Sequence, residues 1–525
     1  MSAAAVLRPL PLAIALALGS LAAHSADLGA GPWWVLAGGF VVLARWWRPA
    51  LAPAVFAIGV ARGAVGPGLL PDGVQADDRT VDRVIGVVCG PVVPTRHGYG
   101  APLDTGEVTL QLWTQDAARI EPGERVAATG IVRSLHTPGA PGQPIASGPA
   151  YELTAQQLEH LGDAASWRDE LWRRAGRVQA GWVAAIDEAG GDPAGRAALA
   201  GIVTGQRTNI PPELDERWRA TGIYHVLSVS GLHLAAVAGL AFALLRRLVA
   251  GSPWGARVHP ARWAAPPALT IAIAYTLITG AQLATVRALI VIVLVLVAAM
   301  LDRPLRLIDA LGTAALAILL WRPDDVLEPS FQLSFTAALV LALLPPVDRR
   351  GVGAWIWRGL RTSTWVTVAT APITAYHFQQ VAVGGIVGNL VLTPIVELAA
   401  LPLALAGLML GAVGTPLLRA ATWIVTQVDR ACSYLEHVAV VGHVAVTRGA
   451  LVVLLVGIAL TLVARRRRSW LDIALWIAMC LAWSTSRQPP PGGALRVTFL
   501  DVGQGDAAIV ELPDGAVWLV DAGGL

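Results

Sequence analysis

The sequence has no lysine and few charged residues of any kind. Only 14% of its 525 residues are charged, whereas 55% are hydrophobic; a typical soluble domain is about 25% charged. All 39 basic residues are therefore arginines, and the formal net charge is +3. This composition excludes an ordinary soluble enzyme and indicates an integral membrane protein, in which bilayer spans replace a globular core. Two explanations of the arginines are possible. One is base-composition bias together with positive-inside signals, and the other is a path whose guanidinium groups bind phosphate bidentately.

Cysteine and several catalytic motifs are also scarce or absent. The three cysteines, Cys89, Cys432 and Cys480, lie far apart and form no CxxC or zinc-finger spacing. We therefore expect all three to be inert. The sequence contains no GxxxxGK[ST] phosphate loop, so the energy for any transport has to come from a separate motor.

Apolar runs that approach the length of a membrane span occupy most of the chain. Three come first, near 9–24, 32–46 and 50–66, and they are short for spans of about 20 residues. Because two apolar runs follow the first one at once, we interpret it as a retained span and not as a cleaved signal peptide. We assign residues 1–70 to N-terminal transmembrane helices. Ten further candidate spans lie near 230–249, 264–280, 284–301, 305–321, 331–346, 363–379, 384–411, 413–428, 448–464 and 469–484.

Prolines interrupt the apolar region from 384 to 428. Pro394, Pro402 and Pro416 fall inside it. We expect broken or re-entrant helices there, which occur in membranes only where the backbone is buried in protein or faces water.

Two segments between the first spans and the core have a different character. Residues 77–160 alternate apolar and polar positions between Gly/Pro turns, which is typical of short strands. This predicts a small barrel of about five strands of the oligonucleotide/oligosaccharide-binding kind, with a small β-sandwich as the alternative. Its exposed aromatic residues are few, which weakens a direct role in base stacking. Residues 164–220 mix Trp, Arg and acidic residues at helical spacing and predict amphipathic, interfacial helices.

Arginine placement predicts the topology of the chain in the membrane. Arg45 and Arg48 follow the second span, and further arginines lie between the core spans. If these loops face the cytoplasm, the β-barrel and the tail at 494–525 lie together on the external side. The tail itself reads as strands around a PDG turn, and it is too short to form an independent sheet domain. We interpret it as the beginning of an incomplete domain.

The stretch TGIYHVLSVSGLH, residues 221–233, gathers polar side chains in front of an apolar run. Its serines and histidines allow a nucleophile and base, a set of metal ligands, or a polar lining at the mouth of a path. The stretch lacks the first glycine of a GxSxG elbow, has no acidic residue to orient a histidine, and offers no carboxylate at ligand spacing. The two roles that remain for this stretch are close helix packing and a polar lining of a path. We expect Gly231 to pack and His233 to line a path; the candidate positions in this stretch are His225, Ser230, Gly231 and His233.

Further polar residues lie within or at the ends of the predicted spans. Buried ionisable groups in a membrane are costly and usually face a bundle interior or a cavity. Arg287 has three possible roles: it can bind a phosphate, pair with Glu397, or act as a purely structural ion-pair partner. The other candidates are Gln282, Gln332, Gln379, Gln380 and Asn389.

Four core motifs in order resemble those of the ComEC family of competence proteins, the inner-membrane channels for DNA uptake. They are TGIYHVLSVSGLHL (221–234), ITGAQLATVRAL (278–289), LEPSFQLSFTAAL (327–339) and YHFQQVAVGGIVGNLVLTPIVE (376–397). The tail, LDVGQGDAAIVELPDGAVWLVDAGG (500–524), resembles the opening strands of the metallo-β-lactamase-like domain of that family. The resemblance covers essentially the whole chain.

The resemblance implies the fold class of a polytopic α-helical membrane protein. An external, OB-like small β-barrel would occupy 77–160, a competence transmembrane core 221–485, and the first strands of a metallo-β-lactamase-like α/β domain 494–525. The opening motif of that last domain consists of Asp501, Gly503, Gln504, Gly505, Asp506 and Asp521. The metal-binding HxHxDH run of the superfamily does not occur in this sequence. No complete metal site or cofactor is therefore expected here, and two divalent metals, Zn or Mn, would be expected only with the rest of that domain.

The function that the resemblance implies is translocation of single-stranded DNA across the inner membrane into the cytoplasm during natural transformation. Single-stranded DNA, the lipid bilayer, an external DNA receptor and a helicase-like cytoplasmic motor are the implied partners. Two alternatives stay open. One is a membrane-anchored nuclease whose catalytic domain is only begun here; the other is a transporter of a different cargo.

Overall fold

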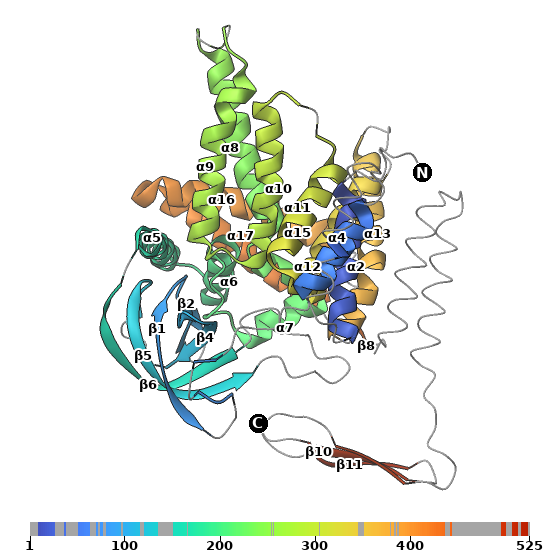
Figure 1. Ribbon diagram of the computed structural model, residues 1–525. Coiled ribbons are helices and arrows are strands. Elements are labelled where there is room, and N and C mark those ends of the chain that lie inside the picture. Colours follow the sequence, from blue (N-terminus) through green and yellow to red (C-terminus); the bar gives the residue numbers. More distant parts are fainter. Residues whose placement is uncertain are drawn as a thin grey trace. The chain divides into compact units, whose positions relative to one another are not determined.

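The computed structural model describes residues 9–26, 36–37, 51–63, 70–71, 74–76, 80–95, 98–115, 120–134, 151–164, 166–253, 255, 257–303, 305–344, 351–378, 380–382, 385, 388–435, 441–443, 495–499, 507–512 and 516–522. The chain divides into two compact units, residues 1–443 and 444–525. Helices make up most of the first unit (Figure 1).

A small β-barrel forms from the region that alternates in sequence. Its strands are β1 (Val81–Val88), β2 (Val93–Thr95), β3 (Gly98–Asp104), β4 (Thr109–Thr114), β5 (Glu124–Ser134) and β6 (Tyr151–Asp163). Five of them close on themselves, because β1 pairs with β5 on one side and with β3 on the other, while β2 extends the edge of β3. The pairing of β4 with β6 is parallel and the others are antiparallel. The predicted barrel of about five strands is thereby confirmed.

The barrel has a core of its own, built by the alternation of the strands. Val84, Val88, Leu103, Leu112 and Leu153 are all almost fully buried in its interior. Their neighbours along each strand are exposed or half-buried, as the burial of β1 and β4 shows. A period of two places one side chain in the core and the next one on the surface.

Three amphipathic helices follow: α5 (Trp167–Ala189), α6 (Pro193–Thr204) and α7 (Pro212–Ala220). Each begins where the sequence supplies a helix start. Ser166 and Asp169 form a capping box at α5, the Asp192 carboxylate accepts a hydrogen bond from the Gly195 amide at α6, and Pro212 opens α7. A 3₁₀ turn, η2 (Tyr224–Leu227), connects α7 to the membrane helices.

The remaining described helices form the rest of the first unit. They are α2 (Pro9–Ala26), α4 (Leu51–Gly63), α8 (Gly231–Gly251), α9 (Pro260–Ile278), α10 (Leu283–Met300), α11 (Leu307–Trp321), η3 (Pro323–Leu327), α12 (Pro329–Leu343), α13 (Val352–Phe378), η4 (Gly388–Leu392), α15 (Thr393–Ile395), η5 (Val396–Ala400), α16 (Leu401–Met409), η6 (Gly411–Gly414) and α17 (Thr415–Leu435), with short strands β7 (Gln380–Ala382) and β8 (Val441–His443).

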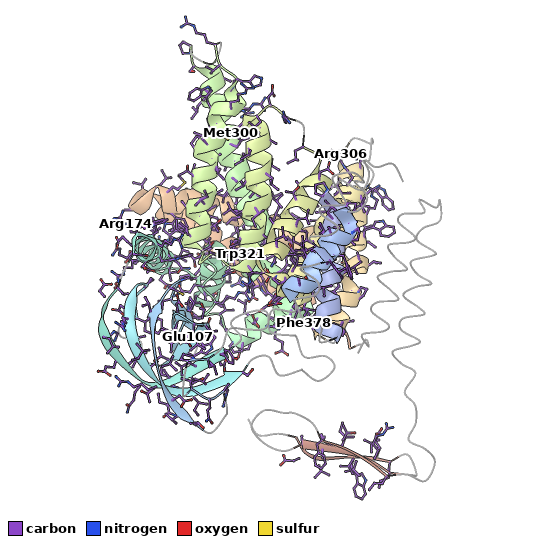
Figure 2. All side chains as sticks on the ribbon, viewed as in Figure 1. Glu107, Arg174, Met300, Arg306, Trp321 and Phe378 are labelled. Carbon is purple, nitrogen blue, oxygen red and sulfur yellow. The ribbon has the colours of Figure 1, made fainter. Side chains whose placement is uncertain are left out.

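Three stretches of the described helices are long and apolar enough to cross a membrane: Gly231–Gly251, Leu283–Met300 and Gly388–Met409. Shorter apolar helices lie at Pro9–Ser20, Ala52–Ala61, Leu307–Trp321 and Pro329–Leu343. The outer face of α8 carries large apolar side chains that no other described element covers, with Leu240 67% exposed and Leu248 62% exposed. Trp321 and Phe378, labelled in Figure 2, are likewise exposed. Such a surface fits contact with lipid.

Small residues bring the first helices close together. A Cβ built on Gly19 would meet the Phe56 carbonyl oxygen at 2.1 Å, and one on Gly59 would meet that of Leu16 at 2.3 Å. The Ser20 hydroxyl also donates to the Gly59 carbonyl at 3.3 Å. Glycine contacts of this kind are how membrane helices pack where no hydrophobic effect drives them together.

Two details of the core differ from expectation. The segment 388–409 continues as one helix through Pro394 and Pro402, because two π-helical turns, η4 and η5, absorb the irregular hydrogen bonding. The segment 413–428, expected to be a span, belongs to the amphipathic helix α17. That helix buries Leu418, Val425 and Val428 against α5, α6 and α16, and it leaves Trp423 64% exposed.

The second unit contains three described strands: β9 (Arg496–Phe499), β10 (Ala507–Glu511) and β11 (Val517–Ala522). They form an antiparallel sheet in the order β11-β10-β9. β10 and β11 make the hairpin that the tail predicts, with Glu511 opposite Val517. The predicted spans at 448–464 and 469–484, most of the one at 32–46, and the turn residues 513–515 lie outside the described residues.

Candidate functional site

The polar stretch 221–233 leads directly into α8, and its last residues cap that helix. The Ser230 hydroxyl accepts a hydrogen bond from the His233 amide at 3.2 Å, and His233 Nδ1 accepts one from the Ser230 amide at 3.0 Å. This is a capping box in which a histidine occupies the position usually held by Glu or Gln. Because an amide N–H points at Nδ1, that nitrogen carries no proton, and the neutral ring holds its proton on Nε2.

His233 Nε2 faces Glu397 from across the core. Nε2 and Glu397 Oε1 lie 3.0 Å apart, and the two side chains are 0% and 5% exposed. The Nε2 proton does not point along this line, because Nε2 makes no hydrogen bond of good geometry, and Glu397 Oε2 also lacks a hydrogen-bond partner. The contact is therefore a close polar pair with unused hydrogen-bonding capacity on both sides. Fully buried groups of this kind are costly in a membrane unless they serve a role.

Glu397 reaches His233 from a π-helical turn, η5. π-Turns are rare and often mark functional positions, because the extra residue redirects a side chain. The helix that contains η5 also lies against the stretch 221–233 at its other end. A Cβ on Gly388 would meet the Thr221 carbonyl oxygen at 2.4 Å. The first and fourth motifs of the sequence are thus in direct contact at two places.

The other positions of the polar stretch lie around this pair. His225 is exposed on η2. The Ser228 hydroxyl donates to the His225 carbonyl at 3.0 Å. Gly231 lies against α10, where an added Cβ would be 3.1 Å from Ala288 Cβ. The structure therefore places Gly231 at a close helix contact and His233 in a fully buried position.

Arg287 is buried at the beginning of α10 and contacts the third motif. Its Nη2 donates to the Ser330 carbonyl at 3.0 Å and to the Ser330 hydroxyl at 2.6 Å. Its Nε and Nη1 make no hydrogen bond, and the side chain is 4% exposed. Arg287 thus contacts Ser330, while Glu397 contacts His233.

Two carboxylates act on Arg287 from the loop that precedes α12. Asp325 and Glu328 both stabilise its charged form. Burial raises the pKa of Glu328, and the neighbouring Asp325 adds to this, while Arg287 opposes the shift. Burial likewise raises the pKa of Asp325, against the lowering effect of Arg322 and Arg287. The charge of the guanidinium group is therefore compensated by Asp325 and Glu328 without a direct hydrogen bond to either. Its Nε and Nη1 nitrogens have no hydrogen-bond partner.

Two further motif positions, Gln332 and Asn389, form short hydrogen-bonded links. Gln332 Nε2 donates to the Val326 carbonyl at 2.9 Å, and Gln332 Oε1 lies 3.0 Å from His377 Nε2. The Asn389 carboxamide oxygen accepts from the Thr393 hydroxyl at 3.2 Å. Both positions remain half-buried. The link from Gln332 to His377 joins the third and fourth motifs.

Gln282 connects the second motif to the loop after α6. Its Nε2 donates to the Gly205 carbonyl at 3.3 Å. Gly205 has φ +79° and caps α6, and a Cβ there would lie 2.4 Å from Gln282 Nε2. A side chain at position 205 would therefore be both strained and obstructed. Polar residues of all four motifs thus contact either one another or the segment from α6 to α8.

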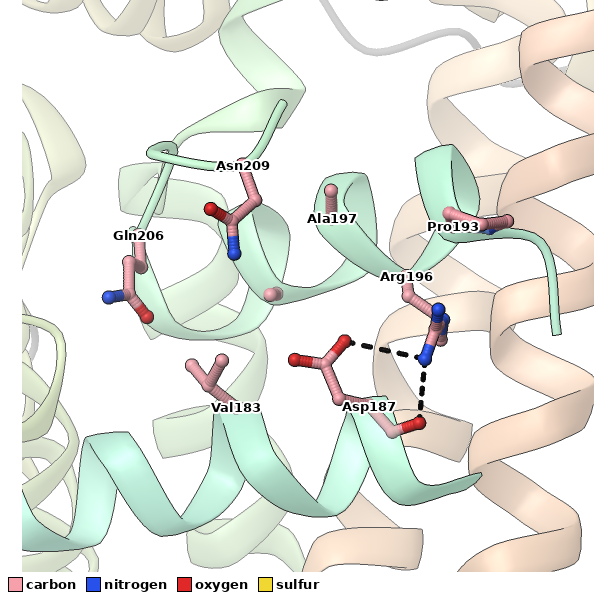
Figure 3. Close-up of a pocket in the computed structure, with 8 residues that line it drawn as sticks. Val183, Asp187, Pro193, Arg196, Ala197, Gln206 and Asn209 are labelled. Atoms are coloured by element: carbon pink, nitrogen blue, oxygen red, sulfur yellow. Dashed lines mark hydrogen bonds and ion pairs between the residues drawn. The ribbon is translucent and has the colours of Figure 1, made fainter. Parts of the chain in front are cut away.

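A polar pocket lies beside this region, between α5, α6 and the loop 205–210 (Figure 3). Its volume is about 200 Å³. Arg196 Nη1 donates to the Asp187 carbonyl at 2.7 Å and lies 3.7 Å from the Asp187 carboxylate. Gln206 and Asn209 contribute carboxamides to the wall.

Among the residues that the structure describes, no group of three or more His, Cys, Asp or Glu side chains is arranged to hold a metal ion. Asp501, Gly503, Gln504, Gly505 and Asp506 lie outside the described residues, as does Gln379. Asp521 is the one member of the tail motif in the described sheet, and it has a positive φ of 53°.

Sequence reasoning missed Ser330 and Asp429. Ser330 stands inside the motif LEPSFQLSF, and its value as an acceptor for Arg287 becomes visible only when α10 and α12 meet. Asp429 on α17 accepts from Arg217 Nη2 at 2.6 Å and from Trp218 Nε1 at 3.0 Å. Asp429 is the only acidic residue of α17, and this was the signal that could have identified it.

Comparison with known proteins agrees with this arrangement of motifs. A family model described as Competence protein matches residues 202–470, just over half of the chain, and this range contains all four motifs. The chain belongs to the competence protein family.

Individual members of this family and other curated proteins are similar over the same region. ComE operon protein 3 of Bacillus subtilis (strain 168) is 24% identical over 62% of this chain and 42% of its own length. Competence protein ComA of Neisseria gonorrhoeae is 28% identical over 67% of this chain and 49% of its own length. The uncharacterised protein YcaI of Escherichia coli (strain K12) is 26% identical over 62% of this chain and 44% of its own length. The chain thus spans slightly less than half the length of these relatives. No solved structure matches it.

Proposed function

We propose that this competence family protein is an inner-membrane channel that translocates single-stranded DNA into the cytoplasm during natural transformation. Family membership supports a role in DNA uptake. The observation that carries the proposal is that buried or half-buried polar residues of the four motifs contact one another, in the pairs His233–Glu397, Arg287–Ser330 and Gln332–His377.

A DNA path needs sequence-blind polar contacts and positive charge along its lining, since every nucleotide carries a phosphate. Arg287 retains two N–H positions with no hydrogen bond, and Gln282, Gln332 and Asn389 offer neutral carboxamides nearby in the motifs. A path that opens during transport is closed when no DNA is present. In that closed state its polar lining would be buried and only partly hydrogen-bonded, as these side chains are. We therefore assign the lining role to these side chains.

The remaining parts of the proposal concern sidedness and partners. With the arginine-rich loops in the cytoplasm, as the positive-inside rule favours, the barrel would lie on the external side, where a DNA receptor would deliver the strand. A cytoplasmic helicase-like motor would supply the energy. The tail strands would open a metallo-β-lactamase-like domain.

The proposal is tested by transformation of a strain in which the gene is deleted and then restored. We expect transformation to be lost on deletion, restored by the wild-type chain, and strongly reduced by Arg287→Ala in a variant that still inserts in the membrane. Normal DNA uptake in the deletion strain would refute the proposed function. Normal uptake with Arg287→Ala would refute the lining role of that residue.

A further inference from the structure

Tyr224, an aromatic residue of the first motif, contacts two arginines, Arg207 and Arg219. Neither arginine is part of the buried polar pairs described above. The guanidinium carbon of Arg207 lies 5.3 Å from the ring centroid of Tyr224, and that of Arg219 lies 4.1 Å from the same centroid. Arg207 Nη1 also donates to the Tyr224 hydroxyl at 2.9 Å. Both are cation–π distances, which stabilise a guanidinium on a ring.

These two positive charges are close enough to repel each other. Because both distances end at one centroid, the two guanidinium carbons are separated by less than the screening length of about 10 Å at 0.1 M salt. Asp215 compensates Arg219 through a contact of 3.0 Å between Oδ2 and Nε. Arg207 has no carboxylate partner among the described residues. The cluster therefore carries an uncompensated positive charge on a fixed support.

The cluster is half-exposed and is continuous with the motif region. Arg207 and Tyr224 are half-buried, and Arg219 is exposed on α7. Arg207 is also held by its loop, where the Thr208 hydroxyl donates to the Pro94 carbonyl of the barrel at 3.0 Å. Tyr224 and His225 are neighbours on η2, within the first motif.

We propose that Arg207 and Arg219, mounted on Tyr224, bind the phosphodiester backbone of single-stranded DNA where it meets the polar motif region. Guanidinium groups bind phosphate oxygens bidentately, and an anion beside both would remove their mutual repulsion. The ring of Tyr224 already contacts both guanidinium groups, so it acts as their support and not as a base-stacking platform. The contact is consequently independent of sequence, as transport of any DNA requires. This inference rests on the proposed function and names the residues that receive the strand.

The test is direct binding of a fluorescent oligothymidylate to the purified full chain in nanodiscs, measured by anisotropy over a range of salt concentrations. We expect the double variant Arg207→Gln/Arg219→Gln to bind at least about tenfold more weakly at 0.1 M salt. Its salt slope should be shallower by about 0.7 for each phosphate that the variant no longer binds. Tyr224→Leu should weaken binding in the same direction, because it removes the support. Arg207→Lys should retain more affinity than Arg207→Gln.

The matched control is Arg174→Gln, which removes an exposed arginine of α5 that pairs with Glu170 and is labelled in Figure 2. This variant should bind like the wild type. Competition by inorganic phosphate at millimolar concentration that equals competition by unlabelled oligonucleotide would show a simple anion site and would overturn the proposal. An unchanged Kd and salt slope in the double variant would overturn it as well. The binding assay does not depend on uptake, so this result leaves the deletion test of the proposed function intact.

Discussion

At the scale of single residues, the pair of His233 and Glu397 is the most unusual feature of the molecule. Its components come from motifs more than 160 residues apart in the sequence. The helix cap fixes Nδ1 of His233 as an acceptor, and Nε2 lies 3.0 Å from Glu397 Oε1 without a hydrogen bond of good geometry. The cap therefore holds the fully buried ring of His233 in one orientation beside Glu397.

Glu397 substitutions test this description. Glu397→Ala removes the carboxylate that lies 3.0 Å from the buried Nε2 of His233 and leaves that nitrogen with no polar neighbour among the described residues. We expect a loss of about 1–3 kcal/mol in the free energy of unfolding. Glu397→Gln keeps an oxygen near Nε2 and should lose clearly less. Denaturant titration of both variants in detergent measures the difference, and equal losses would show that charge, and not an acceptor, is what His233 requires.

Cys89 provides a pH-dependent prediction outside the membrane. Desolvation of the thiol raises its pKa, and the Asp104 carboxylate adds to the shift. The thiolate is the reactive form, so at neutral pH Cys89 should be alkylated by iodoacetamide more slowly than a free cysteine peptide although it is exposed. The rate should still be rising at pH values where the peptide has reached its plateau. Cys432, which is 0% exposed, serves as the control and should react only on unfolding; alkylation of Cys89 at the peptide's rate would contradict the account.

The residues of the site could be named from the sequence, whereas their partners could not. Polar side chains stand out within apolar runs, so His233, Arg287, Gln332 and Glu397 were all candidates. Arg287 was considered as a partner for Glu397, but it contacts Ser330, while Glu397 contacts His233. Which residues meet depends on helix packing and on the π-turn η5, and neither leaves a periodic signal in the sequence.

At the scale of elements, the helix from Gly388 to Met409 fits tightly against the segment that enters α8. A methyl group at position 388 would collide with backbone and side-chain atoms, namely the Thr221 carbonyl oxygen and Ile223 Cγ2 at 2.8 Å. Backbone atoms cannot move aside as the end of a side chain can. The contact therefore fixes the relative position of the first and fourth motifs.

Gly388→Ala should destabilise the fold by about 1–3 kcal/mol, because overpacking forces a backbone shift. The matched control is Gly239→Ala in α8, where a Cβ would meet no atom within 4 Å. This control should be neutral or slightly stabilising, by up to about 1 kcal/mol, since alanine favours helix. Thermal unfolding of both variants in the same detergent compares them, and equal midpoints would show that the two motifs are not tightly packed.

The elements themselves were largely predictable, and the exceptions have physical causes. The strands of the barrel follow from the alternation of apolar and polar residues between Gly/Pro turns, and the amphipathic helices follow from the helical spacing in 164–220. The segment 413–428 was expected to cross the membrane because its average composition is apolar. The structure instead assigns this segment to α17, which carries the charged residues Arg419, Asp429 and Arg430 beside a buried apolar face, and Asp429 joins that helix to α7. Prolines at 394 and 402 were expected to break a helix that π-turns allow to continue.

At the scale of the whole molecule, the first unit combines a closed barrel, an amphipathic collar of α5 to α7, and a bundle of apolar helices (Figure 1). The collar is where the polar features gather: the pocket at Asp187 and Arg196, the arginines around Tyr224, and the stretch that leads into α8. A competence protein that conducts DNA needs an entrance of this polarity in front of a path through the helices. The central claim is that the four motifs line that path.

Photocrosslinking of the incoming DNA strand tests this claim most directly. A photoreactive amino acid is placed singly at Gln282, at Asn389, and at Leu240 on the apolar outer face of α8, in cells that still transform. During uptake of labelled DNA, we expect crosslinks to the DNA strand from positions 282 and 389 and none from position 240. Active transformation with no crosslink from either motif position, or with equal crosslinking from Leu240, would contradict the account.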